Sequence, residues 1–92
     1  MEVFENDDEG YLAWIATNPD GHVVNTTRPP SEDYLKLHSA RCHTIGGTPA
    51  HGEAWTRGQY MKVCAATIEE LAQWARDQFG EGVELDECRI CF

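Results

Sequence analysis

The chain lacks the features that would place it in a membrane or outside the cell. Its 92 residues contain no apolar run approaching the roughly 20 residues that a membrane-spanning helix needs. The opening residues, Met-Glu-Val-Phe-Glu-Asn-Asp-Asp, show neither the basic start nor the apolar stretch of a secretion signal. The sequence therefore predicts a single cytoplasmic domain over residues 1–92, with no membrane contact and with an acidic, flexible start over residues 1–9.

Residues that support nucleophilic catalysis are also scarce. There are two serines, Ser31 and Ser39, and neither lies in the sequence context of a hydrolase nucleophile. No other set of side chains forms a recognisable catalytic group, and we predict no catalytic residues. A binding module is therefore favoured over an enzyme.

Positive charge is outnumbered, with seven Lys and Arg against sixteen Asp and Glu, for a net charge of −9. Binding to phosphates requires clustered positive charge, because its affinity comes from displaced counterions. Most of the excess acid lies in residues 2–9 and 81–87, so the body between them is nearly neutral. Two partner classes stay open: a nucleic acid, or a protein that contacts the acidic termini. The cations that could form a basic face for a nucleic acid are Arg28, Lys36, Arg41 and Arg57.

Cysteine is present at four positions, and three of these fall in two spaced motifs. His38 and Cys42 form an H-x3-C pair, and Cys88 and Cys91 form a C-x2-C pair. One imidazole and three thiolates are the ligand set of a closed, tetrahedral structural zinc site. In a chain this short the hydrophobic core is small, and a bound metal contributes on the order of 10 kcal/mol to folding. The sequence therefore predicts one zinc ion held by these four residues.

Alternatives to this ligand set stay open. Four cysteines can form disulfides, although a reducing compartment disfavours them, and a C-x2-C pair can be a redox motif, although no helix follows this one. His43 is the main rival to His38 as the fourth ligand. Cys64 lies between Val63 and Ala65 in an apolar segment, which favours a core position over a ligand role.

The pattern along the chain predicts an α+β fold, with a small antiparallel sheet, a packed helix and an extra N-terminal helix. Asp7 or Asp8 can cap a first short helix that ends before the turn sequence at residues 18–21. Strands are predicted at 21–27, 33–38 and 60–65. Thr67-Ile-Glu-Glu is a capping box, and the apolar stripe that follows it predicts a helix to Phe79.

A glycine-rich segment over residues 44–59 predicts a long loop, and long loops in small domains are often functional. The loop carries His51, Trp55 and Arg57, and an aromatic plane beside a guanidinium suits a base or an anionic ligand. These three residues form a possible recognition loop. The alternative is that the tryptophan folds back onto the sheet.

The order of these features resembles the metal-binding domain at the N-terminus of the Ada DNA-alkylation repair proteins, over about residues 23–92. It resembles still more the small Ada-like zinc modules, in which a His-x-x-x-Cys pair precedes the loop and a Pro-Cys-x-x-Cys pair follows the helix; Glu87 here replaces that proline. The resemblance implies zinc ligand roles for His38, Cys42, Cys88 and Cys91. In Ada a zinc-bound thiolate accepts a methyl group, and His38 takes the corresponding position. An imidazole lacks the charge for that role, so methyl transfer is the least favoured function.

Overall fold

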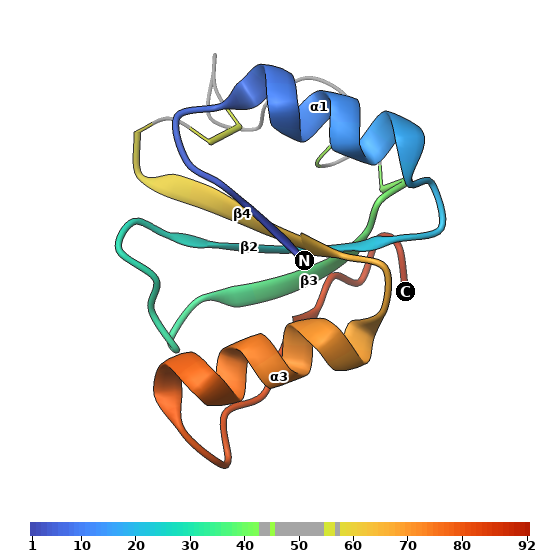
Figure 1. Cartoon of the computed structure of the whole chain (residues 1–92). Coiled ribbons are helices and arrows are strands. Elements are labelled where there is room, and N and C mark those ends of the chain that lie inside the picture. Colours follow the sequence, from blue (N-terminus) through green and yellow to red (C-terminus); the bar gives the residue numbers. More distant parts are fainter. Residues whose placement is uncertain (43–44, 46–54, 57) are drawn as a thin grey trace.

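The structure is a computed structural model of the chain, and it describes residues 1–42, 45, 55, 56 and 58–92. A helix covers each face of a five-stranded sheet, so the molecule has three layers (Figure 1). The elements in chain order are β1 (Glu2–Phe4), α1 (Asp8–Thr17), β2 (His22–Thr27), β3 (Leu35–Ser39), β4 (Tyr60–Ala65), α3 (Ile68–Phe79) and β5 (Asp86–Glu87). This arrangement confirms the α+β class, the packed helix and the extra N-terminal helix.

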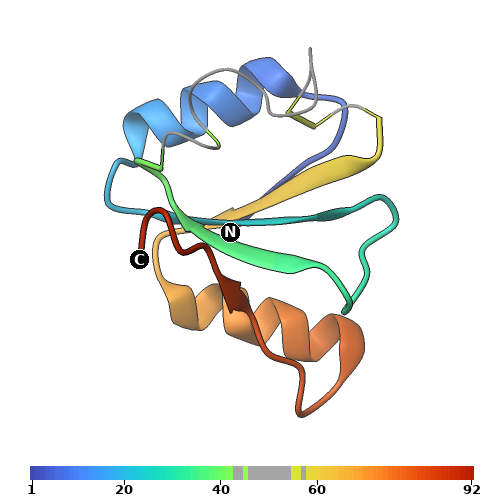
Figure 2. The same cartoon turned by 180° about the vertical axis from the view of Figure 1, so that it is seen from behind.

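The strand order in the sheet is β1-β4-β2-β3-β5, and the sheet is mixed. The three predicted strands β2, β3 and β4 pair antiparallel, and β1 adds antiparallel to β4. In contrast, β5 pairs parallel with β3 through Lys36 opposite Asp86 and Leu37 opposite Glu87. The direction of β5 follows from the connection, because the chain leaves β4, passes along α3 and returns beside β3 (Figure 2). The predicted small antiparallel sheet is therefore present, with the parallel β5 added at one edge.

The acidic start of the chain contains a strand, where the sequence predicts a flexible segment over residues 1–9. In β1, Val3 lies opposite Val63 of β4. The ring of Phe4 packs edge-on against that of Tyr11, with 6.1 Å between centroids. The side chain of Asp7 then caps α1 by accepting a hydrogen bond from the Gly10 N–H at 2.9 Å. Edge pairing and a helix cap thus hold these residues against the body.

The two faces of the sheet produce two separate cores, because successive side chains of a strand point to opposite faces. In β4, Val63 faces α3 and Cys64 faces α1. The α3-side core consists of Val24, Leu35, Leu37, Met61, Val63, Ala65, Leu71, Trp74 and Ala75. The α1-side core consists of Tyr11, Val23, Cys42, Ile45, Trp55, Cys64 and Cys88. The second core contains two of the predicted metal ligands.

The helix α3 forms as its sequence predicts. Thr67 is the N-cap, and its hydroxyl and the side chain of Glu70 satisfy each other's backbone N–H groups in a capping box. Leu71 and Ala75 are buried against the sheet, whereas Ile68 at the start of the same stripe is 39% exposed. Gly80 ends the helix with a positive φ of 97°. In the part of the chain that the structure describes, no helix is long and apolar enough to cross a membrane.

Candidate metal centre

His38 belongs to β3 and lies on the face of the sheet that α1 covers. Its neighbour Leu37 points into the α3-side core, so the alternation of the strand turns the imidazole to the opposite face. The side chain is 6% exposed. A rigid, paired strand therefore fixes the first candidate ligand.

Cys42 follows β3 after one tight turn. Its N–H donates a hydrogen bond to the Ser39 carbonyl oxygen at 3.0 Å, which closes the turn and brings the thiol back beside the strand. The residue is 4% exposed and belongs to the α1-side core. The three residues between His38 and Cys42 are thus the end of a strand and a turn.

Cys88 and Cys91 come from the segment after β5. The Cys88 N–H donates to the Leu37 carbonyl oxygen at 2.8 Å, which extends the β3–β5 pairing to the thiol itself. The Cys88 sulfur accepts hydrogen bonds from the N–H groups of Ile90 and Cys91, and the Cys91 sulfur accepts one from the Ser39 N–H at 3.4 Å. Backbone amides directed at sulfur stabilise thiolates. These amide hydrogen bonds therefore favour the ionised form of each sulfur and oppose the effect of burial.

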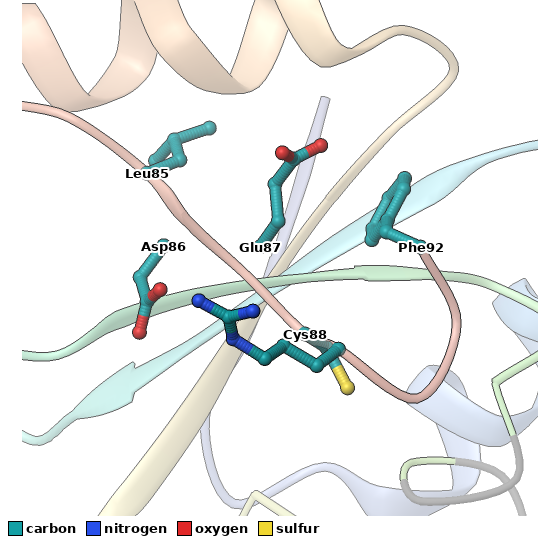
Figure 3. Close-up of a pocket in the computed structure, with 6 residues that line it drawn as sticks. Leu85, Asp86, Glu87, Cys88 and Phe92 are labelled. Carbon is teal, nitrogen blue, oxygen red and sulfur yellow. The ribbon is translucent and has the colours of Figure 1, made fainter.

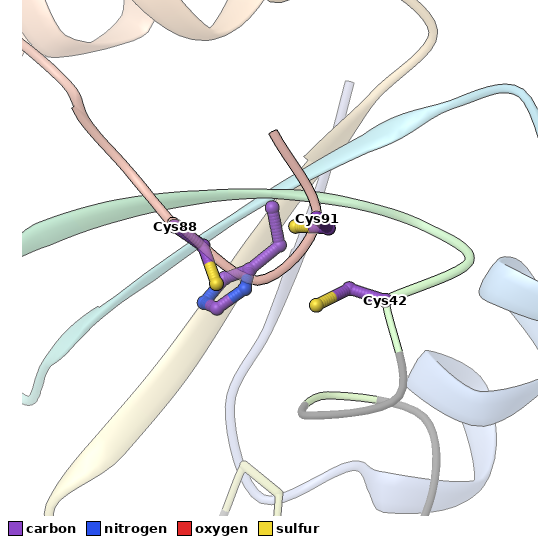
Figure 4. A group of neighbouring side chains, drawn as sticks. Cys42, Cys88 and Cys91 are labelled. Carbon is purple, nitrogen blue, oxygen red and sulfur yellow. The ribbon is translucent and has the colours of Figure 1, made fainter.

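The four candidate ligands converge on one point. One ligand atom from each of His38, Cys42, Cys88 and Cys91 can be chosen so that all four lie within 4.8 Å of one another. Figure 4 shows the three cysteine sulfurs approaching from the turn after β3 and from the C-terminal segment. Sulfurs bound to a tetrahedral zinc at about 2.3 Å lie about 3.8 Å apart. Shifts of about 1 Å would therefore convert the cluster into a coordination sphere.

The electrostatics of the cluster suit a cation. Burial, with Lys62 and Lys36 nearby, lowers the pKa of His38 to about 4, so the imidazole is neutral at pH 7 with a lone pair available. Burial and the neighbouring sulfurs raise the pKa of Cys91 to about 12, despite the hydrogen bond from Ser39. Burial also opposes ionisation of Cys88, but hydrogen bonds from the backbone N–H groups of Ile90 and Cys91, together with those from the Cys91 and Cys42 thiols, outweigh it and lower the pKa of Cys88. Three gathered sulfurs cannot all ionise without a compensating positive charge, which a divalent metal supplies.

The described part of the predicted recognition loop does not form an exposed patch. Trp55 is 7% exposed and packs against Tyr11, with 6.1 Å between ring centroids. Its ring is therefore part of the α1-side core, as the alternative interpretation had it, and it is not free to stack on a base. His51, Arg57 and the rival ligand His43 lie outside the described residues.

The predicted basic face is largely neutralised where the structure describes it. Lys36 forms an ion pair with Asp86 at 2.7 Å, and Arg41 forms one with Asp20 at 2.9 Å. The guanidinium of Arg28 donates to the Asn6 side chain at 3.0 Å. These cations already have partners within the chain.

Two residues near the site differ in whether the sequence alone could predict their role. Cys64 is fully buried in the α1-side core, outside the ligand cluster, which confirms its prediction as a core residue. Ser39 contributes to the site through its N–H, which no side-chain motif signals. Backbone donors of this kind can be found only from the fold.

Comparisons with known proteins found no relative of this chain. No family model matches it, and no match was found among curated proteins or among solved structures. The resemblance to the Ada-like modules therefore rests on the ligand spacing and on the order of elements. The established result is a buried cluster of one histidine and three cysteines that could hold a metal ion.

Proposed function

We propose that this chain is a binding module whose fold is stabilised by one structural zinc ion, bound by His38, Cys42, Cys88 and Cys91. The observation that carries the proposal is the convergence of these four ligand atoms within 4.8 Å, from segments 46 positions apart in the sequence between Cys42 and Cys88. Three exposed acids, Glu84, Asp86 and Glu87, precede Cys88. Burial of an apolar segment therefore does not by itself explain why the thiols lie together.

Zinc fits this donor set better than the other common metals. Thiolate sulfur is a soft ligand that magnesium and calcium avoid, and a mixed sulfur and imidazole set in a tetrahedral arrangement is typical of zinc. Four protein ligands leave no position for a water molecule, so the proposed ion is structural, and a binding role is favoured over an enzymatic one. The resemblance of this chain to the Ada-like zinc modules is part of the same proposal.

For the partner, we favour a protein over a nucleic acid. The described cations of the predicted basic face are engaged with Asp86, Asp20 and Asn6, and the net charge of −9 opposes contact with a phosphate backbone. Binding to phosphates would weaken steeply as salt rises to physiological strength, whereas an apolar protein contact would respond little. A salt series thus separates the two classes.

The zinc proposal is tested by native mass spectrometry together with elemental analysis of the purified chain. We expect one zinc per chain in the wild type and loss of the zinc and of cooperative unfolding in Cys91→Ser. Cys64→Ala is the matched control, because it removes a buried cysteine outside the cluster. That variant keeps its zinc and loses only packing, on the order of 1 kcal/mol.

Two results would contradict the proposal. One is a wild-type chain that folds cooperatively with no metal and gains no stability when zinc is added. The other is equal zinc content in Cys91→Ser and in the wild type. A zinc site with a water ligand, visible as exchangeable coordination in cobalt-substituted protein, would instead have the open position of a catalytic site and would favour an enzymatic role.

A further inference from the structure

A groove lies between α3 and the segment that leads into β5, on the face of the sheet opposite the metal centre. Its volume is about 360 Å³. Ile68 and Ala72 of α3 form one wall, Val83 and Leu85 form the other, and Leu37 of β3 forms the floor. Ile68 is 39% exposed, although it belongs to the apolar stripe of α3. Leu37 itself is buried, so the exposed apolar surface of the groove comes mainly from Ile68 and from the half-buried Ala72, Val83 and Leu85.

The second wall owes its composition to strand alternation. Figure 3 shows Leu85 and Glu87 directed toward α3, and Asp86 and Cys88 directed away from it. Asp86 meets Lys36 on that other face, and Cys88 joins the cluster there. One short segment therefore supplies a metal ligand on one face and an apolar wall with a carboxylate on the other.

The rim of the groove is acidic and unneutralised. Glu84 and Glu87 line it, both are exposed, and neither forms an ion pair or hydrogen bond with any residue that the structure describes. By contrast, Asp86 beside them is paired with Lys36. Uncompensated carboxylates around an apolar floor are complementary to a ligand that carries both positive charge and aliphatic side chains.

We propose that this groove binds a segment of another protein that carries both lysine or arginine and aliphatic residues. The aliphatic side chains of the segment contact Ile68 and Leu85, and its cations meet Glu84 and Glu87. The positive charge of the partner follows from the acidic rim, and its aliphatic residues follow from the apolar walls.

Other occupants fit the groove less well. A second copy of this chain carries a net charge of −9, so two copies repel one another, and a nucleic acid is repelled by the same carboxylates. Either of them would reveal itself in the experiment below.

The test uses the full chain and a fluorescein-labelled peptide with the sequence Lys-Ile-Lys-Ile-Lys-Ile, followed by fluorescence anisotropy. Two peptides of equal length, one with Glu in place of Lys and one with Ser in place of Ile, separate the contributions of charge and of apolar contact. We expect binding of the first peptide only, with NMR shift changes concentrated at Ile68, Ala72, Val83 and Leu85.

Two pairs of variants sharpen the test. The double substitution Glu84→Lys with Glu87→Lys is expected to weaken binding about tenfold or more. Its control, Glu5→Lys with Glu9→Lys, changes the net charge equally at exposed positions away from the groove and leaves the affinity within about twofold. Ile68→Gln is expected to weaken binding severalfold, and Leu12→Gln, at a similarly exposed position of α1, leaves it unchanged.

Several results would overturn the proposal. These are no binding of the lysine-isoleucine peptide, equal binding of the lysine-serine peptide, and equal weakening by the two double variants. Concentration-dependent dimerisation that Ile68→Gln abolishes would assign the groove to a second copy. Direct binding of labelled single-stranded DNA to the chain, abolished by Ile68→Gln, would assign the groove to a nucleic acid. Zinc content is measured on every variant, so a failure here is distinct from a failure of the metal proposal.

Discussion

Lys62 is a charged residue inside the α1-side half of the molecule. It lies on β4, two residues before Cys64, and is 4% exposed. Its ammonium group donates to the Trp55 carbonyl oxygen at 2.7 Å and to the Asn25 side chain at 2.9 Å, and it lies 5.6 Å from the centroid of the Tyr11 ring. Burial lowers the pKa of Lys62 to about 8, against the opposing influence of Cys64 and Asp8. The folded state therefore holds this proton less tightly than the unfolded chain does.

This lowered pKa predicts a pH-dependent contribution to stability. The unfolded lysine, with a pKa of about 10.4, stays protonated where the folded one loses its proton, so stability rises with pH above 8 and the contribution is lost as pH falls toward 8. From pH 8 to pH 9 the gain is about 1 kcal/mol. Urea unfolding of the wild type and of Lys62→Met at both pH values measures it, because other titrating groups cancel in the difference. A constant difference between the two proteins would contradict the assigned pKa.

At the scale of elements, the helices and the longer strands could be predicted because their signals are local. Thr67 and Glu70 define the start of α3, and Leu71 and Ala75 define its buried face. The short strands β1 and β5 could not be predicted. With three and two residues they carry no period, and each depends on an open edge of a neighbour that only the folded sheet provides.

The candidate site was predictable for a different reason, since short spacings between ligands reflect the turn that joins them. The H-x3-C spacing matches a strand end and a turn, and the C-x2-C spacing matches the turn after β5. The burial of Trp55 was not predictable with certainty. Whether a loop tryptophan packs inward depends on the position of Tyr11, which is distant in sequence.

A mutation in β1 can test whether the start of the chain packs, as in the structure, or is flexible, as the sequence predicts. Phe4→Ala removes a half-buried ring that packs on Tyr11, and we expect it to lower the free energy of unfolding by about 1–3 kcal/mol. Glu5→Ala, at an exposed position in the same segment, serves as the control and changes it by less than about 0.5 kcal/mol. Urea denaturation followed by circular dichroism measures both. Equal, negligible effects would show that residues 1–9 do not pack.

At the scale of the whole molecule, charge repulsion opposes folding. The net charge of −9 is concentrated near the two ends of the chain. The three described ion pairs are partly or largely exposed, and pairs of this kind contribute little stability that salt could remove. Repulsion between like charges therefore dominates the response to salt.

We accordingly expect sodium chloride to stabilise the fold. Raising it from about 10 to 300 mM shortens the Debye length from about 30 Å to below 8 Å and should increase the free energy of unfolding by on the order of 1 kcal/mol. Urea titrations at the two salt concentrations, with zinc content held constant, provide the measurement. A decrease with salt would mean that ion pairs outweigh repulsion in this protein.

The separation of the two ligand pairs has a consequence for folding kinetics. From Cys42 to Cys88 the chain runs through 46 positions that include β4 and α3, so an ion held by both pairs is a reversible cross-link across half of the sequence. A permanent cross-link over such a loop removes about 4 kcal/mol of chain entropy from the unfolded state. In the proposed zinc-bound state, coordination by all four ligands requires β3 and the C-terminal cysteine pair to lie side by side, as they do in the folded sheet. Full coordination would then be a late event, which slows unfolding more than it accelerates folding.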